Sequence, residues 1–306
     1  MTVRRPARVL AALAGLLALA ACGTARPGGP QDNGAAADGA AADDAVRVMS
    51  FNLRLNVASD SANAWPHRRD AAAQIVGGAD LVGVQEATPG MLADLDARLP
   101  GFARVGVGRE ADGGGEQSAV LYRADRFEVL DSGTFWLSPT PDVPGSVGWD
   151  AALPRVATWA RLRDRRGGAA LVAVNTHFDH VGETARRESA RLLVERARTL
   201  AGGGPLVVTG DVNAADTSAV YRTLTADLRD ARLASEAPAT GPAATWTDFG
   251  RATDRRRIDF VLVGGPVRVL RAATDDRTVG DVVGTDSRRL PSDHSPVTAT
   301  LVLDAP

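Results

Sequence analysis

Short apolar runs alternate with longer amphipathic segments from residue 46 to the end of the chain. The short runs are rich in Val, Leu and Ile, which is typical of strands that are buried on both faces. They cover residues 46–51, 81–84, 119–122, 170–175, 206–209, 258–263 and 297–303. Three longer segments are predicted to be helices, and they cover residues 68–76, 89–99 and 183–200. This mixture predicts an α/β fold with two sheets at its core and helices outside.

Polar motifs stand at the ends of five of these apolar runs. They are SFNLR from Ser50, VQEAT from Val84, NTHFDH from Asn175, TGDVNA from Thr209 and SDHSP from Ser292. Strand ends commonly carry the chemistry of α/β enzymes. One such motif alone is more typical of a cap or a surface turn, but five in this context predict a single site.

Some of these polar residues are suitable ligands for a hard divalent metal ion. Glu86 ends a run of apolar residues, where a carboxylate is unfavourable unless it is paired or binds a metal. Mg²⁺ needs few protein carboxylates because it keeps several waters, so Glu86 with Asn52 nearby would anchor it. An Asx turn is the alternative for Asn52. Asp293 is a candidate ligand or base, with a solvated loop as the alternative.

Other polar residues are suited to proton transfer and to stabilising charge on a phosphate ester. Asp211 and Asn213 point the same way if the chain stays extended, and a turn is the alternative. His177 and His294 stand beside polar residues, and two imidazoles facing one phosphate can donate hydrogen bonds or carry protons. Asp259 interrupts an apolar run and is a candidate to orient one of these histidines.

The N-terminus predicts export and a lipid anchor. A stretch with three arginines precedes a 13-residue apolar run that ends at Ala21. This run is short for a membrane span, and its flanks are those of a secretory signal. Cys22, the only cysteine, stands where a bacterial lipobox places the lipidated thiol. We therefore expect a lipoprotein signal peptide over residues 1–21, with an ordinary cleaved signal as the alternative.

The rest of the chain is predicted to be a tether followed by one domain. Residues 22–45 are rich in Gly, Ala and Asp without apolar periodicity, which is typical of a flexible linker. Residues 46–304 are long enough to bury the core of one large domain. The expected location is the outer face of the cytoplasmic membrane, with the membrane reached through the lipid on Cys22.

Charge limits the range of partners. The chain has 35 basic and 37 acidic residues and a formal net charge of −2 at pH 7. A tight nucleic-acid binder commonly carries a strong basic excess, because its affinity depends on neutralising phosphates. The composition therefore provides no support for such a partner.

The motifs together resemble those of the endonuclease/exonuclease/phosphatase superfamily, which includes pancreatic deoxyribonuclease. The resemblance covers nearly all of residues 46–303, and its most specific parts are GDVN from Gly210 and SDH from Ser292. It implies a four-layer α/β/β/α sandwich, in which two mixed β-sheets pack face to face and helices flank them. It also implies a site at one end of the sheets.

The resemblance implies a role for each candidate at the metal and the attacking water. Asn52 and Glu86 would hold Mg²⁺, or Mn²⁺ or Ca²⁺ in its place, and Asp293 would join them. Asp211 would orient or deprotonate the water. Asn213 would contact the scissile phosphate.

It also implies roles for residues around the phosphate. His294, braced by Asp259, would stabilise charge on the phosphoryl oxygens. His177 would act from the opposite side or help the leaving oxygen, with Glu116 as its carboxylate partner. Arg155, just before a strand, matches a family arginine near the phosphate.

These expectations describe a metal-dependent hydrolase that cleaves an extracellular phosphodiester or phosphomonoester by in-line attack of water. A nuclease, a sphingomyelinase-like lipid hydrolase and a small-molecule phosphatase stay open, so the substrate is a nucleic acid, a phospholipid or a small phosphorylated molecule. The competing hypothesis is a non-catalytic surface lipoprotein that binds anionic ligands or a protein partner. We expect a monomer.

Overall fold

Two six-stranded mixed β-sheets form the centre of the protein in the computed structural model, which describes residues 44–304. The neighbouring strands of the first sheet are, in order, β11 (Val267–Thr274), β12 (Val297–Leu303), β1 (Val46–Asn52), β2 (Leu81–Ala87), β4 (Gln117–Arg123) and β3 (Phe102–Val105). Those of the second sheet are β5 (Phe127–Trp136), β6 (Val156–Asp164), β7 (Ala170–His177), β8 (Leu206–Asp211), β10 (Asp259–Gly264) and β9 (Arg229–Asp230).

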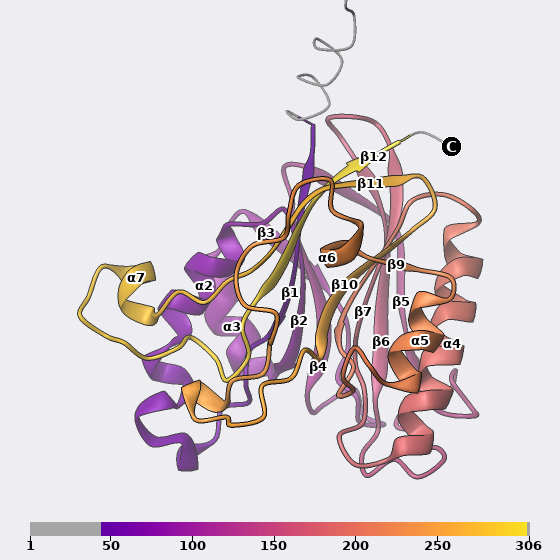
Figure 1. Cartoon of the computed structure of the whole chain (residues 1–306). Helices are drawn as coiled ribbons and strands as arrows, with labels where there is room; N and C mark the ends of the chain where they lie inside the picture. The colour runs from indigo at the N-terminus through magenta and orange to yellow at the C-terminus, as the bar shows by residue number, and fades with distance from the viewer. Residues whose placement is uncertain (1–43, 305–306) are drawn as a thin grey trace, which may run out of the picture.

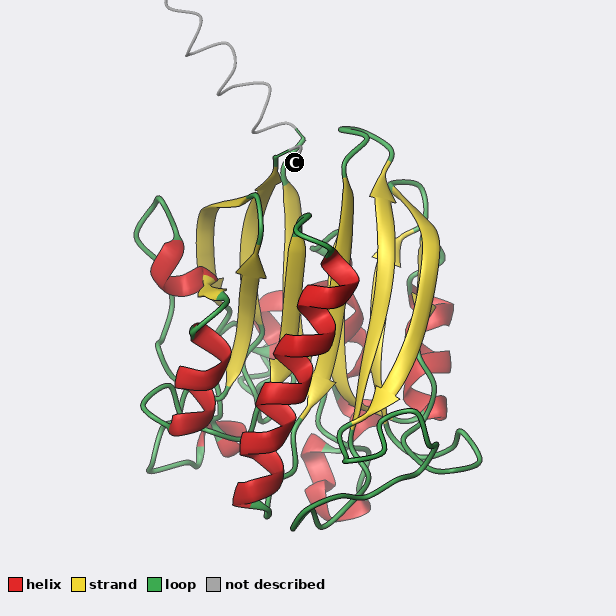
Figure 2. Ribbon diagram, turned by 90° about the vertical axis from the view of Figure 1, so that its right-hand side faces the viewer, coloured by secondary structure: helices red, strands yellow, loops and turns green. Residues whose placement is uncertain are grey.

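Helices cover the outer faces of the two sheets. Figure 1 shows α2 (Arg69–Gly77) and α3 (Pro89–Arg98) beside the first sheet, and α4 (Glu183–Ala201) and α5 (Ala219–Thr225) beside the second. Figure 2 shows the same second sheet from the side that the helices cover. The remaining helices are short, and they are η1 (Ala58–Asn63), η2 (Trp65–His67), α6 (Ala231–Ala234), η3 (Asp248–Gly250) and α7 (Val279–Val283). The expected four-layer α/β/β/α sandwich is confirmed.

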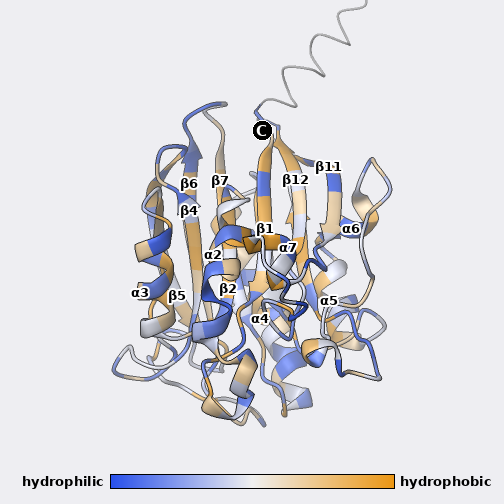
Figure 3. Ribbon diagram, turned by 90° about the vertical axis from the view of Figure 1, so that its left-hand side faces the viewer, coloured by the Kyte–Doolittle hydropathy of each residue, from blue (hydrophilic) through white to orange (hydrophobic). Residues whose placement is uncertain are grey.

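Apolar side chains fill the three interfaces between the layers. Val48, Leu162 and Val261 belong to the cluster between the two sheets. Val84 packs with the helices outside the first sheet, and Val208 with those outside the second. Because the central strands face apolar layers on both sides, their sequences are continuous apolar runs, and Figure 3 shows these strands in hydrophobic colours.

A buried amide joins the two sheets near one end. Asn175 in β7 donates from Nδ2 to the backbone oxygens of Val84 at 2.8 Å and of Ala119 at 2.9 Å, both in the first sheet. A Cβ atom on Gly83 would lie 2.4 Å from Asn175 Oδ1 and 2.0 Å from Thr209 Oγ1. The glycine therefore allows close contact of the sheets, and the amide fixes their relative position.

Two parallel strand pairs carry the polar motifs to a common edge. β1 runs parallel to β2, and β7 runs parallel to β8. Asn52, Glu86, His177 and Asp211 all lie in the last two positions of these four strands. Because parallel strands end at the same edge of a sheet, these side chains gather at one end of the sandwich.

Both ends of the described chain lie at the opposite edge of the sandwich (Figure 1). Val46, which begins β1, pairs with Leu301 near the end of β12. Asn52 and Val297 are at the other ends of the same two strands. The site and the chain ends are therefore separated by the length of the sheets.

All seven predicted strands and all three predicted helices are present. The sequence prediction did not include β3, β5, β6, β9 and β11. The predicted signal peptide, the predicted lipidation site Cys22 and almost all of the predicted tether lie outside residues 44–304. Within that described range, no helix combines the length and the apolar character that crossing a bilayer requires.

Candidate active site

The backbone at the end of β2 is shaped to present Glu86. The pairing of β2 with β4 changes register between Val84 and Ala87, and Glu86 has a φ of 57°. A left-handed backbone is unfavourable for a residue with a side chain and is concentrated at functional sites. Asn213, just after β8, is a second such residue, with a φ of 46°.

Asn52 connects the two sheets at the site. Its Nδ2 donates to Glu86 Oε1 and to Asp211 Oδ2, both at 3.0 Å, while its Oδ1 accepts from the backbone N–H of Arg54 at 2.9 Å. The N–H of Arg54 fixes the direction of the amide, so a donor faces both carboxylates. In this conformation Asn52 orients the two carboxylates, and its role as a metal ligand stays a prediction.

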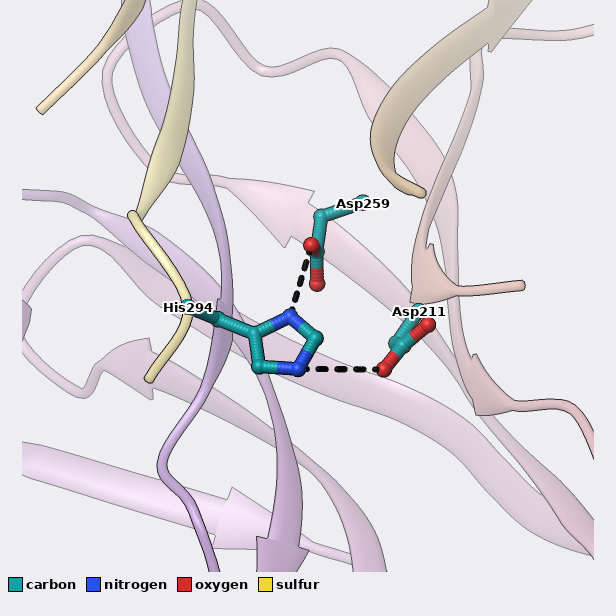
Figure 4. A group of neighbouring side chains, drawn as sticks. All are labelled: Asp211, Asp259 and His294. Carbon is teal, nitrogen blue, oxygen red and sulfur yellow. Dashed lines mark hydrogen bonds and ion pairs between the residues drawn. The ribbon is translucent and has the colours of Figure 1, made fainter. Parts of the chain in front are cut away.

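Asp211, Asp259 and His294 form a buried cluster (Figure 4). His294 Nδ1 lies 2.8 Å from Asp259 Oδ2, and its Nε2 lies 3.8 Å from Asp211 Oδ2. The three residues bring their ligand atoms within 4.8 Å of one another, so the cluster could hold a metal ion. The expected bracing of His294 by Asp259 is present in this geometry.

The electrostatic surroundings of His294 suit an acid–base role. Burial alone lowers the pKa of His294, but the charge and hydrogen bond of Asp259 and the charge of Asp211 outweigh it and raise the pKa to about 10. Without a metal ion in the cluster, these carboxylates favour the imidazolium form of the ring at neutral pH.

The surroundings of Asp211 disfavour its charged form, whereas those of His294 favour the charged form. Burial, together with the charge of Asp259, raises the pKa of Asp211 to about 7, although His294 and the backbone N–H of Asn213 lower it. That N–H donates to Asp211 Oδ1 at 2.9 Å. A carboxylate that takes up a proton near neutral pH is suited to general-base catalysis.

His177 is held as a neutral acceptor beside this carboxylate. Burial, and then the charge of Arg155, keep the pKa of His177 well below its usual value. Asn213 Nδ2 lies 3.1 Å from His177 Nε2 and donates to the backbone oxygen of Phe178 at 3.0 Å. Because the carbonyl of Phe178 requires the amide nitrogen at that position, Nε2 of His177 accepts the second hydrogen bond.

Glu86 and Asp293 form the part of the site that fits a divalent cation. Glu86 Oε2 accepts the backbone N–H of Leu55 at 2.7 Å. Asp293 is buried, and burial followed by the charge of Glu86 raises the pKa of its carboxyl, despite nearby positive charges. The nearest of these is Arg54, at 3.8 Å. Both residues supply the carboxylate oxygens that Mg²⁺ prefers.

Glu116 and Arg155 line the side of the site next to His177. Glu116 Oε1 lies 2.8 Å from Arg109 Nη2, and no hydrogen bond joins Glu116 to His177 within residues 44–304. In this structure Glu116 is therefore the partner of Arg109. Arg155 is buried, and its Nη2 lies 3.0 Å from Nδ1 of His180.

Arg68 has a structural role at the site, whereas the sequence left contact with a phosphate, helix capping and solvent exposure open for the His67-Arg68-Arg69 cluster. It is 2% exposed, and it donates to the backbone oxygens of Leu53, Arg54 and Pro291. Its guanidinium also lies 5.2 Å from the ring centre of Trp65. It thus ties the loop after β1 to the segment before Asp293. The WPHR segment was its only signal in the sequence, and it does not distinguish a buried arginine from an exposed one.

Comparisons with known proteins agree with this fold. The model of the Endonuclease/Exonuclease/phosphatase family matches residues 49–294. No curated protein matches the chain.

Three solved structures from Bacteroides are similar over most of their length. An endonuclease/exonuclease/phosphatase from Bacteroides vulgatus is 41% identical with a TM-score of 0.79, covering 85% of this chain and 99% of that one. A family protein from Bacteroides thetaiotaomicron is 36% identical with a TM-score of 0.78, covering 85% and 95%. A mannosyl-6-phosphatase from the same organism is 35% identical with a TM-score of 0.76, covering 84% and 100%.

Proposed function

Because this chain belongs to the endonuclease/exonuclease/phosphatase family, a family of phosphate-ester hydrolases, we propose that it is a metal-dependent phosphomonoesterase that acts on a phosphorylated sugar or polyol. The observation that carries this proposal is the convergence of the Asp211, Asp259 and His294 cluster with Glu86 and His177 at one end of the sandwich. This arrangement offers a base, a cation and a metal anchor around the space for one phosphate.

Two observations support a sugar monophosphate as the substrate: similarity to a solved relative and the net charge of the chain. The Bacteroides thetaiotaomicron relative named as a mannosyl-6-phosphatase is 35% identical over the whole of its chain. The formal net charge of −2 offers no basic excess for tracking a nucleic-acid backbone. A phosphodiesterase that acts on a nucleic acid or a lipid is the less favoured alternative.

Mg²⁺ is the proposed metal, with Glu86 and Asp293 as its protein ligands and Asn52 orienting Glu86. When bound there, the ion supplies neutralisation of charge on the phosphate oxygens. Mn²⁺ and Ca²⁺ are the alternatives, because they accept the same oxygen ligands.

Each of the remaining site residues has a separate role in hydrolysis. Asp211 takes a proton from the attacking water, and the Asn213 amide keeps His177 in position. The imidazolium of His294 donates to the phosphoryl oxygens, where negative charge increases in the transition state. The leaving oxygen takes its proton from solvent water, and Arg155 adds positive charge near the neutral ring of His177.

We also propose that the protein is exported and anchored through a lipid on Cys22 to the outer face of the cytoplasmic membrane. The signal-like N-terminus supports this. A tether over residues 22–45 would join the domain at the start of β1, at the edge opposite Asn52, which ends this strand. Such an attachment leaves the site facing away from the membrane.

Hydrolysis assays on the purified protein test the proposed function. The substrates are mannose 6-phosphate, inositol phosphates, sphingomyelin, plasmid DNA, RNA and bis-p-nitrophenyl phosphate, each with Mg²⁺, Mn²⁺, Ca²⁺ or EDTA. His294→Ala should abolish turnover, and His67→Ala, the same change at an exposed histidine, should not. Release of phosphate from the sugar ester that stops in EDTA supports the proposal. Binding of anions by folded, metal-loaded protein without any turnover would favour the competing binding-only function.

A further inference from the structure

A small hollow lies beside the catalytic cluster on the side of His177. Its cavity volume is about 10 Å³, which is the space that one water-sized group needs. Its polar wall is formed by Glu86, Arg109, Glu116, Gln117, Ser118, Arg155 and His177. Because Glu86 and His177 also belong to the proposed catalytic site, any group in the hollow lies next to the phosphate.

Gln117 has an unused acceptor in this wall. It begins β4, where it pairs with Ala87 at the end of β2. Its Oε1 is buried and has no hydrogen-bond partner in the part of the chain that the structure describes. Buried carbonyl oxygens are nearly always hydrogen-bonded, so an exception next to a catalytic site indicates a missing donor. The missing donor must be small, because the hollow is small.

The charges around the hollow argue against a second anionic group. Arg109 Nη2 is already 2.8 Å from Glu116 Oε1, and Arg155 Nε is 3.6 Å from Asp179 Oδ2. Each arginine therefore has a carboxylate of the protein nearby, but Nε of each is buried without a hydrogen-bond partner among the described residues, and it can donate to a neutral oxygen. A second phosphate would also meet Glu86 and Glu116 at close range.

The wall is equally unsuited to an apolar group. Val156 is its only apolar residue, so an alkyl or aryl group would leave the charged and amide groups without partners. A hydroxyl group fits the wall better, because it donates one hydrogen bond and accepts others. It can donate to Gln117 Oε1 and accept from a guanidinium.

We infer that the hollow binds one hydroxyl group of the alcohol part of the substrate, with Gln117 as the residue that selects for it. The inference rests on the proposed phosphomonoesterase function and narrows its substrates to esters with a hydroxyl group close to the phosphate. Gln117 is then a specificity-determining residue and takes no part in the chemical step.

Steady-state kinetics of the Mg²⁺-loaded protein test this role. The substrates are mannose 6-phosphate, its monodeoxy analogues and p-nitrophenyl phosphate, whose alcohol part has no further hydroxyl group. Gln117→Met removes the acceptor and keeps the length of the side chain. Gln74→Met makes the same change on the exposed side of α2 and serves as the control.

We expect the wild type to lose roughly tenfold or more in kcat/KM when the selected hydroxyl is absent, as for one lost hydrogen bond to a buried group. Gln117→Met should lose as much with mannose 6-phosphate and nothing further with that deoxy analogue. Its kcat/KM for p-nitrophenyl phosphate should stay within about twofold of the wild type, as for a change that leaves the fold intact.

Two results would overturn the inference. One is an equal loss on p-nitrophenyl phosphate and on the sugar ester, which would make Gln117 a structural residue. The other is unchanged discrimination among the deoxy analogues by Gln117→Met, which leaves the hollow to a water molecule. Binding of mannose 6-phosphate, measured by calorimetry, distinguishes failure of this inference from failure of the proposed function. If no ester is hydrolysed, the proposed function fails, whereas the inference fails if Gln117→Met binds the sugar phosphate as tightly as the wild type.

Discussion

The two ends of the sandwich both bury charged side chains, but only one end pairs them fully. At the end where the described chain begins, Arg126 is 2% exposed and lies 3.1 Å from Asp80 and 2.7 Å from Asp164. It also donates to the backbone oxygens of Asp44 and Ala45. Arg126, Asp80 and Asp164 therefore each face an opposite charge at this end.

The catalytic end, in contrast, leaves some buried polar atoms unpaired. Asp259 Oδ1 and Gln117 Oε1 are buried without hydrogen-bond partners in residues 44–304. Asp211 has no full counter-charge, since its histidine neighbours are 3.6 and 3.8 Å away. Charges at the first end therefore stabilise the fold, while those at the second are available to a substrate and a metal. Substitutions at the two ends should consequently have different effects.

The largest expected effect is on turnover, from Asp211→Asn. Loss of the general base should lower kcat/KM by about 10³–10⁴-fold.

The same change, Asp211→Asn, should improve the stability of the fold at higher pH. The folded pKa of Asp211, about 7, exceeds the unfolded value, so the wild-type carboxyl disfavours folding increasingly as pH rises toward 7. The melting temperature of the variant relative to wild type, measured in EDTA, should therefore increase between pH 5 and pH 8. A constant difference would contradict the unpaired state of Asp211.

Arg126→Met should have the largest effect on stability. It leaves Asp80 and Asp164 buried without their main partner, which destabilises by about 3–5 kcal/mol. Urea unfolding measures this loss, and kcat per folded molecule should not change. Arg165→Met, at an arginine with a 53% exposed side chain, is the matched control and should unfold like the wild type. A loss of kcat in Arg126→Met would mean that the two ends are coupled.

Asp259→Asn should lower kcat/KM by about 10²-fold, within the range of general acid–base effects, and also change the pH profile. Asp259 is the main reason that the pKa of His294 rises to about 10 in spite of burial. Activity that needs the imidazolium is present below this pKa and lost above it. The alkaline fall in kcat/KM should therefore move to lower pH in the variant and stay in place in Asp276→Asn, an exposed control. An unmoved alkaline limb would assign that limb to another group.

Arg47→Ala tests the weakest contact of the paired end. Arg47 lies 3.2 Å from Asp80, but its side chain is 55% exposed, and Asp80 keeps Arg126 as a partner. The free energy of unfolding should fall by no more than about 1 kcal/mol, because solvent screens exposed ion pairs. Urea unfolding beside Arg126→Met makes the comparison. Similar losses in the two variants would show that exposure does not matter at this end.

Predicted strands and missed strands differ in how deeply they are buried. β8 is buried at every position and reads as a continuous apolar run. β5 and β11 lie at sheet edges and contain exposed positions, so no apolar run marks them. β9 has only two residues. Local sequence therefore predicts most inner strands but not β6, which lies next to the edge strand β5, and strand pairing defines the edges.

The site follows the same rule. The positions of Asp211 and His294 were predictable because motifs at strand ends meet once the sheets form. The pairing of Glu116 with Arg109 depends on the turn of an irregular loop. The burial of Arg68 depends on the carbonyl of Pro291, 223 positions away. Contacts between distant loops leave no periodic signal in the chain.

The placement of both ends of the described chain at one edge also has a practical consequence. Val46 and Leu301 are paired neighbours, whereas Asn52 and Val297 lie at the far ends of the same two strands. A bead, a surface or a fusion partner joined at residue 44 or residue 304 will therefore sit behind the domain and leave the catalytic face open. Since β1 and β12 are neighbouring strands, residues 44 and 304 can be joined and the chain reopened in an exposed loop, which gives a circular permutant with the site undisturbed.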